Sequence, residues 1–289
     1  MRMLLTKLSR AMFPCREIVG MRSSLIRGMA ARTVVPVLWL AAMGMLIPVG
    51  TARAQNESTA QEHPLVPAIQ MAKQSYEIVQ QLKDYEATLI KRELINGRLT
   101  SQRIRMKTRE NPFSIYLYYE EPNPGREVLF VMGQNQNQLL VREAAGVASL
   151  VGTVSLPVDS PQVMAENRHV ITDMGMRRLL ELLITQWELE SKYAECDVKF
   201  YPGARMGNAE CEVIESSHPR PRKQFPYHMT RVFFEKKSRL PIRIENYGFP
   251  PQPNQPAPLV EEYTYINVRT NIGLTPADFD RRNPNYSFR

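Results

Sequence analysis

The sequence predicts an α+β protein in which helices cover an antiparallel sheet. The clearest observation is a pair of alternating apolar and polar runs, 240–247 and 260–268, joined by a proline-rich stretch and typical of a long hairpin. Short alternating runs also follow one another closely through residues 85–158, which favours antiparallel strands over alternating parallel units. Two stretches, 65–82 and 174–193, repeat apolar residues at steps of three and four and predict amphipathic helices.

The first helix is expected directly before the sheet. Its apolar stripe consists of Leu65, Ala68, Ile69, Ala72, Tyr76, Val79 and Leu82. Strands are then predicted at 85–93, 99–108, 113–119, 126–132 and 138–143, with a weaker one within 146–158. Asn96-Gly97 separates the first two strands and is the most specific short hairpin signal available. An antiparallel meander is therefore expected after the first helix.

The second helix, 174–193, has an apolar face broad enough to cover a sheet. That face consists of Met176, Leu179, Leu180, Leu183, Ile184 and Trp187. Alternating runs at 195–201 and 209–215 follow, on either side of a turn, and predict another hairpin. A strand at 229–234 then leads into the final hairpin.

Basic residues are concentrated at the amino terminus. Eight Lys or Arg and one acidic residue precede Gln55, whereas 29 basic and 28 acidic residues follow it. The remainder of the chain is nearly neutral, so nucleic-acid binding loses its main support.

The same amino-terminal region has the layout of a secretory signal. A basic region is followed by an uncharged run, 33–50, and by the small-x-small site Ala52-Arg53-Ala54. We predict a signal peptide at 1–54 cleaved near Ala54, a flexible leader at 55–64, one domain at 65–289, and a periplasmic or otherwise extracytoplasmic location. Two alternatives are translation from Met21 and an uncleaved membrane anchor.

Two cysteines, Cys196 and Cys211, remain after removal of this segment. They lie in the two runs of one predicted hairpin, nearly opposite each other, in a compartment where disulfides persist. A disulfide closing this loop would stabilise the fold by roughly 3 kcal/mol. A disulfide is the favoured prediction and two buried free thiols are the alternative, while the absence of a CxxC motif disfavours a reactive or metal-binding role.

The carboxyl-terminal half carries a family resemblance. The stretches HMTRVFFEKKSRLPIRIE, LPIRIENYGFP, PLVEEYTYINVRTNIGLTPADFD and NPNYSF resemble the secreted bacterial family catalogued as domain of unknown function 1571. The resemblance covers roughly Leu65 to Phe288 and is most specific at the carboxyl end. The family brings no activity that could be carried over to this chain.

The layout is also similar, more remotely, to the periplasmic lipoprotein carriers and outer-membrane lipoprotein receptors of the LolA and LolB kind. In those proteins a curved antiparallel sheet forms an incomplete barrel with helices in its mouth, and the resemblance implies the same fold here. The proline-rich loop Pro250 to Pro258 is extra, and no residue-by-residue match to a carrier's ligand positions is present.

No motif for catalysis or metal binding is present in the sequence. None of the histidines has ligand spacing; they are His63, His169, His218 and His228. Asp278 and Asp280 share one side of the chain, where solvent exposure or capping of a turn is the expected role. The sequence therefore predicts a non-enzymatic protein with no cofactor and no metal.

The leading functional hypothesis is an extracytoplasmic protein that binds or carries an amphipathic ligand, such as a lipid, an acyl chain or a lipidated protein. An incompletely closed sheet would leave apolar side chains between sheet and helices for such a ligand. Strand parity gives the candidate lining residues Leu117, Tyr119, Val128, Phe130, Ile242 and Ile244. The same side chains would simply be core if the helices seal the sheet.

The alternative hypothesis is a structural or protein-interaction module of the cell envelope without a small ligand. It would engage an envelope protein through the loop at 249–258 or through a strand edge. In either case no nucleic acid is expected, and membrane contact would be transient or made through an uncleaved amino-terminal anchor.

Overall fold

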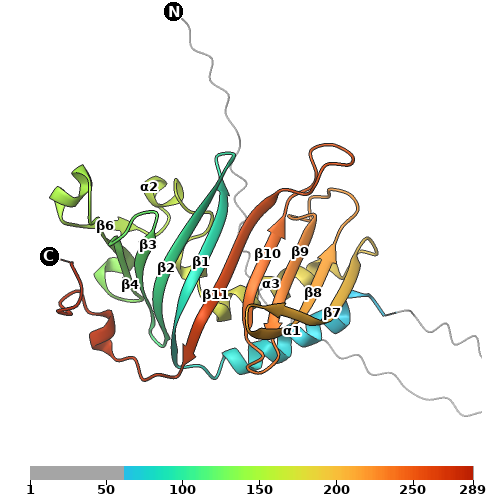
Figure 1. Ribbon diagram of the computed structural model, residues 1–289, viewed down its shortest axis with the longest axis horizontal. Helices are drawn as coiled ribbons and strands as arrows, with labels where there is room; N and C mark the ends of the chain where they lie inside the picture. The colour runs from blue at the N-terminus through green and yellow to red at the C-terminus, as the bar shows by residue number, and fades with distance from the viewer. Residues whose placement is uncertain (1–61, 289) are drawn as a thin grey trace, which may run out of the picture. The chain divides into compact units, whose positions relative to one another are not determined.

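The computed structural model describes residues 62–288, which fold around one large antiparallel sheet (Figure 1). Within that range the sheet has eleven strands in the order β6-β5-β4-β3-β2-β1-β11-β10-β9-β8-β7. They are β1 (Asp84–Ile95), β2 (Arg98–Glu110), β3 (Phe113–Glu121), β4 (Glu127–Val131), β5 (Gln138–Arg142), β6 (Thr153–Pro157), β7 (Asp197–Met206), β8 (Ala209–Ser217), β9 (Met229–Glu235), β10 (Pro241–Tyr247) and β11 (Leu259–Thr270). The end strands β6 and β7 are not paired with each other. The predicted fold class, an open antiparallel sheet with helices, is therefore confirmed.

The predicted signal peptide, its two alternatives and most of the predicted leader lie outside the described residues. For residues 62–288, none of the helices is long and apolar enough to cross a bilayer.

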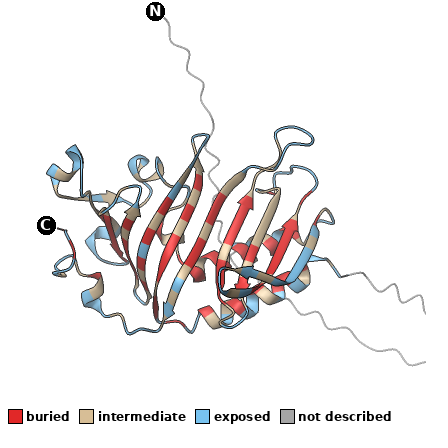
Figure 2. Ribbon diagram, viewed as in Figure 1, coloured by how far each residue is buried: buried red, intermediate tan, exposed pale blue. Residues whose placement is uncertain are grey.

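Two helices cover one face of the sheet, which we call the helix face. They are α1 (Leu65–Val79) and α3 (Met176–Glu190), close to their predicted bounds. They pack against each other, and the Tyr76 hydroxyl of α1 donates a hydrogen bond to Glu181 of α3 at 2.8 Å. Their apolar stripes join inward strand residues in one core, so the buried positions concentrate in the middle of the sheet (Figure 2).

The chain between β6 and β7 crosses the helix face of the sheet. These strands are consecutive in sequence but lie at opposite edges of the sheet. The intervening residues must therefore cross the whole helix face, through α2 (Pro161–Met164), η3 (Ile171–Asp173) and α3. We call the part before α3, residues 158–175, the crossover segment; no motif in the sequence predicts it.

The opposite, outer face of the sheet carries a row of charged side chains at directly paired positions on six adjacent strands. From β7 to β1 these are Lys199, Glu215, Arg231, Glu245, Glu262 and Arg92. Glu245 and Glu262 are like charges directly opposite each other, and Arg243 forms ion pairs with both. On this part of the face cross-strand ion pairs take the place of apolar burial, and each pair of opposite charges contributes about 0.2–1 kcal/mol.

The carboxyl-terminal segment covers another part of the outer face. The 3₁₀ turn η4 (Pro276–Phe279) and the residues after it form a second apolar cluster with side chains of β3, β4 and β5. Tyr286 stacks on Tyr116 with ring centroids 3.9 Å apart, and the Ser287 amide donates to Glu127 at 3.0 Å. Phe279 is buried in this cluster rather than in the core under the helices.

Each edge strand contains a proline. Pro157 is the last residue of β6, and Pro202 lies within β7, where the register with β8 shifts between Tyr201 and Ala204. Proline has no backbone N–H and interrupts the row of hydrogen-bonding groups that an edge presents.

The predicted disulfide is wrong. In the β7–β8 hairpin Cys211 pairs with Ala204, whereas Cys196 lies just before Asp197, which pairs with Ser217 at the other end. A disulfide needs Cα atoms within about 7 Å, and cysteines at opposite ends of a hairpin cannot meet that limit. Both cysteines are free and buried, which is the alternative that the sequence left open. Burial raises the pKa of Cys196 to about 12 and also raises that of Cys211.

We expect neither thiol to react with iodoacetamide in the folded protein at pH 8, because both are buried and protonated. Both should become alkylated after denaturation without a reductant. Peptide mapping by mass spectrometry would assign each site separately from Cys15. A Cys196–Cys211 linked peptide from non-reduced protein would contradict this register.

Candidate ligand-binding site

A cavity of about 330 Å³ lies between the helix face, α3 and the crossover segment. Strand alternation turns its sheet residues inward, and strand pairing arranges them in rows across β1, β11 and β10. Leu89 pairs with Tyr265, and Lys91 pairs with Tyr263, which in turn pairs with Ile244. The next row is polar and consists of Glu93, Glu261, Asn246 and Thr230. The cavity wall therefore changes from apolar to polar along the strands.

Helix α3 supplies the apolar roof. Leu179, Leu183 and Trp187 line the cavity from the buried side of the helix, and the Trp187 ring is held by a 3.1 Å hydrogen bond to Ser216. Leu182 and Pro226 also line the cavity, and both are exposed. The cavity thus reaches solvent between α3 and the β8–β9 loop.

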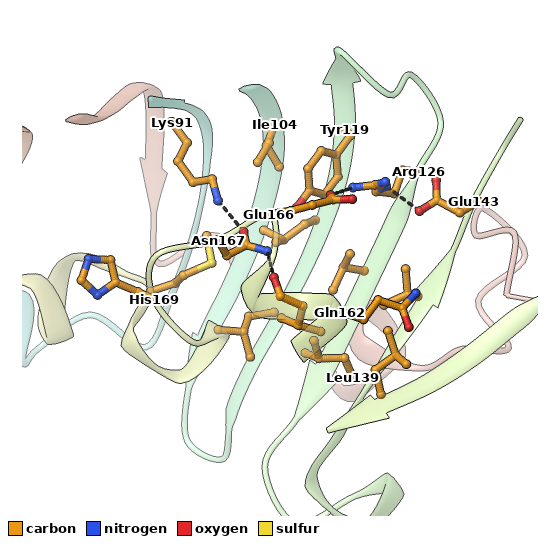
Figure 3. Close-up of a pocket in the computed structure, with 17 residues that line it drawn as sticks. Lys91, Ile104, Tyr119, Arg126, Leu139, Glu143, Gln162, Glu166, Asn167 and His169 are labelled. Atoms are coloured by element: carbon orange, nitrogen blue, oxygen red, sulfur yellow. Dashed lines mark hydrogen bonds and ion pairs between the residues drawn. The ribbon is translucent and has the colours of Figure 1, made fainter. Parts of the chain in front are cut away.

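A smaller cavity of about 90 Å³ lies beside the first, under the other half of the crossover segment (Figure 3). Its walls include apolar residues of β2 to β6 and the polar side chains of Arg126, Glu143 and Glu166. Arg126 forms ion pairs with Glu143 at 2.7 Å and with Glu166 at 2.6 Å. Both cavities are lined by Lys91, Asn167, His169 and Met174. The polar side chains of this shared set, Lys91, Asn167 and His169, form a polar waist between the larger, mainly apolar cavity and the smaller, more polar one.

Glu261 lines the larger cavity and binds the waist residue His169, and its side chain is almost fully buried. Its carboxylate accepts from His169 Nε2 at 2.8 Å, Arg168 Nε at 3.1 Å, and two further donors. Those donors are the Tyr227 hydroxyl at 2.7 Å and the Asn246 amide at 2.8 Å. Burial alone would raise the pKa of Glu261, but the hydrogen bond and charge of His169, with the bonds from Tyr227 and Asn246, lower it to about 2. The hydrogen bond to Glu261 in turn raises the pKa of His169.

Glu93 lies directly opposite Glu261 on the neighbouring strand. Like charges in this position repel, and the intervening donors offset the repulsion. The Arg168 amide and Lys91 Nζ both approach Glu93 Oε2, at 3.2 and 3.1 Å, and the Tyr263 hydroxyl donates to Oε1 at 2.5 Å. Burial lowers the pKa of Lys91, and the charge of Glu93 opposes that effect.

These contacts also hold the crossover segment on the sheet. Asn167 accepts from Lys91 at 2.5 Å, and Arg168 and His169 bind Glu261. No residue of the segment after β6 pairs with a strand in the described structure. The crossover segment, which covers both cavities, is therefore held on the sheet by side-chain contacts and not by backbone hydrogen bonds between strands.

Four of the six predicted lining residues line one of the two cavities, and the other two do not. Leu117, Tyr119 and Val128 line the smaller cavity and Ile244 lines the larger one. Phe130 and Ile242 are buried in the core and line neither cavity.

No sequence motif predicts the polar waist. His169 lacks ligand spacing, because its partner Glu261 lies 92 residues away in the sequence. One signal was present: Lys91 and Glu93 share the parity of the inward Leu89, and inward charges on a strand need partners.

The other candidate polar residues have structural roles. Asp278 accepts from the Thr275 amide and from Lys107, capping η4 as expected. Asp280 pairs with Arg282. His218 pairs with Glu190 of α3 at 3.2 Å and stacks on Phe225, which fixes the β8–β9 loop against the helix. Among residues 62–288 no cluster of three or more His, Cys, Asp or Glu could hold a metal ion.

Comparison with known proteins identifies the family. The model of a family described as "Protein of unknown function (DUF1571)" matches residues 82–288, and the chain belongs to this family, as its sequence predicted. A search of curated proteins finds no match.

The chain is also similar to several solved structures. A lipoprotein-sorting protein domain from Vibrio parahaemolyticus, described as putative and of the outer membrane, is 12% identical with a TM-score of 0.36, over 74% of this chain and 96% of that one. A LolA superfamily protein from Nitrosomonas europaea is 10% identical with a TM-score of 0.34, over 73% and 96%. The Mycobacterium tuberculosis lipoprotein LppX is 13% identical with a TM-score of 0.44, over 74% and 100%. At these values the similarity says nothing about ligand or activity.

We expect the substitution Glu261→Gln to lower the free energy of unfolding at pH 7 by about 3 kcal/mol, because it removes a buried charge that holds Arg168 and His169. The pKa of Glu261 is lower in the folded protein than its unfolded value of about 4.3. Its contribution is therefore complete above that value and is lost as the pH falls toward 2. Urea unfolding should show the two proteins converging over this range.

Glu188→Gln is the matched control. Glu188 pairs with Lys73 at the surface, where both side chains are about half exposed. This substitution should change stability by no more than about 0.5 kcal/mol. A constant difference between Glu261→Gln and the unsubstituted protein from pH 7 to 2 would contradict the proposed role of the carboxylate charge.

Proposed function

We propose that this protein binds, and carries outside the cytoplasm, an amphipathic ligand with an apolar chain. The observation that carries the proposal is the 330 Å³ cavity with an apolar wall at one end and hydrogen-bonding side chains at the other. Its volume is within the range of about 300–1,000 Å³ typical of small-molecule sites. The apolar side chains that line this cavity would gain dispersion contacts with a hydrocarbon chain.

The rows of paired residues give the ligand an orientation. The chain would lie along Leu89, Tyr265 and Trp187, and its polar group would lie at Lys91, Asn167 and His169. Each methylene group that leaves water contributes about 0.8 kcal/mol to binding, so the chain supplies most of the affinity and the waist fixes the position of the head.

The polar groups favour binding over catalysis. Glu93 and Glu261 each accept several hydrogen bonds, and Asp173 at the cavity wall pairs with Arg178 at 3.0 Å. Carboxylates engaged in this way are poor general bases, because protonation would break the contacts that position them. The location outside the cytoplasm depends on the amino-terminal signal in the sequence.

Protein purified from its own envelope should contain a lipid or acyl compound at near one-to-one stoichiometry, measured by native mass spectrometry and organic extraction. Leu183→Trp, which fills the cavity from α3, should abolish loading. Phe130→Leu is the control, because Phe130 is equally buried but lines neither cavity. It should lower stability and leave loading intact. Absence of ligand from the unsubstituted protein, with no uptake of added lipid, would favour the interaction-module alternative.

Trp187 offers a direct measure of chain binding, because its ring lines the cavity. In a Trp39→Phe background, fatty acids brominated on the chain should quench its fluorescence. Affinity should rise about fourfold with each added methylene until the cavity is full, and then level off. An affinity that does not depend on chain length would contradict burial of the chain.

A further inference from the structure

A different cavity, of about 340 Å³, lies on the outer face of the sheet between β4, β5 and the carboxyl-terminal segment. It is separate from the proposed lipid cavity, which lies on the helix face. Leu140 and Phe279, both buried, form part of its apolar floor. Its polar wall has a distinct composition: Arg109, Arg281, Arg282, Gln134, Asn135 and Gln138.

The wall has an excess of positive charge. Three arginines and a single acidic residue, Asp280, line the cavity, and Asp280 is already paired with Arg282 at 2.7 Å. Arg109 and Arg281 have no carboxylate within ion-pair distance among residues 62–288. This contrasts with the charged row on the same face, where Arg92, Arg231 and Arg243 each have a glutamate partner. The cavity therefore presents two guanidinium groups whose charge no carboxylate of the described residues neutralises.

Arg109 is held in place by contacts that leave most of its donors unused. Its Nη2 donates to Ser114 at 3.0 Å, and its guanidinium lies 5.0 Å from the centre of the Phe279 ring. Its Nε is buried and has no hydrogen-bond partner. A buried N–H without an acceptor is costly, and Arg109, which lines the cavity, has further guanidinium N–H groups that can bind an anion there.

The loop between β4 and β5 adds amide groups to the same wall. Asn135, Gln136 and Asn137 follow one another with φ of 47°, 55° and 57°, a left-handed conformation that costs non-glycine residues roughly 1 kcal/mol each. The Asn137 side chain holds this turn by accepting from the Gly133 amide at 2.7 Å. The side-chain amides of Gln134 and Gln138 make no hydrogen bond with any residue in the described range. Both are free to bind a ligand.

We propose that this cavity binds a small organic anion, in which a carboxylate or phosphate group is held by Arg109 and Arg281 and neighbouring hydroxyl groups by the amides of Gln134 and Gln138. Planar guanidinium groups match the geometry of both anions. Amide side chains suit the hydroxyls of a sugar or a glycerol, and the exposed ring of a sugar would lie against the apolar floor.

Isothermal titration calorimetry of the full chain at low ionic strength tests the proposal. The probes are glucuronate, inorganic phosphate and glycerol 3-phosphate, with glucose as the neutral control. The anions should bind with an affinity that falls as salt is added, and glucose should not bind. Tightest binding of glucuronate would identify an acidic sugar, and tightest binding of glycerol 3-phosphate would identify a phosphate headgroup. No binding of any anion at millimolar concentration would overturn the proposal.

Two substitutions locate the site. Arg109→Gln should weaken anion binding at least tenfold, and Arg281→Gln, whose side chain is exposed and leaves folding intact, should weaken it severalfold. Arg205→Gln is the matched control. Arg205 is exposed on β7, and its substitution removes the same charge away from the cavity. If Arg281→Gln and Arg205→Gln weakened binding equally, the loss of one positive charge anywhere on the protein would explain the effect, which would contradict the proposed site. Quenching of Trp187 by brominated fatty acid should be unchanged in all three variants, so failure of one proposal leaves the other standing.

Discussion

The buried carboxylate of Glu261 is the contact on which the cavity architecture depends. It joins strand β11 to the crossover segment through Arg168 and His169, and to the β8–β9 loop through Tyr227. A buried charge is tolerated only when it is fully paired, and here four donors meet the two oxygens. The same contact therefore closes the cover over both cavities and creates the polar end of the larger one.

The two faces of the sheet are stabilised in different ways. The helix face buries apolar side chains under α1 and α3, as expected for a sheet with one covered side. The outer face has no comparable helical layer within the described residues and uses the cross-strand row of charges, with the carboxyl-terminal segment packed beside it. The cavity on the helix face therefore lies between the sheet and a helix, whereas the cavity on the outer face lies between the sheet and the carboxyl-terminal segment.

Much of the fold could be predicted because its signals are local. Alternation located the strands, and Asn96-Gly97, both with positive φ, forms the predicted turn. The cysteine pairing failed because β7 continues through Pro202-Gly203 to Met206 and the turn lies at Gly207-Asn208, which places Cys211 beside the turn and Cys196 at the far end of the hairpin; alternation alone does not fix a register. Parity correctly turned Leu117, Tyr119, Val128 and Ile244 inward. It could not separate them from Phe130 and Ile242, since the crossover segment decides which inward residues stay uncovered.

The polar waist could not be predicted from the sequence for a related reason. Lys91, His169 and Glu261 come from three distant parts of the chain, and the topology that joins them depends on β6 and β7 lying at opposite edges of the sheet. No short motif records such a connection. The only sequence signal for the waist was the pair of inward charges on β1, Lys91 and Glu93.

The prolines in the two edge strands have a consequence for the protein at high concentration. An open sheet of eleven strands has two unpaired borders, and a border of this kind can template fibre growth by accepting a strand from another molecule. Pro157 and Pro202 each remove a donor there, and the irregular register at Pro202 bends the strand away from a flat template. Self-assembly by strand addition is thus disfavoured at both borders, so the sheet can stay open without becoming a seed for aggregation.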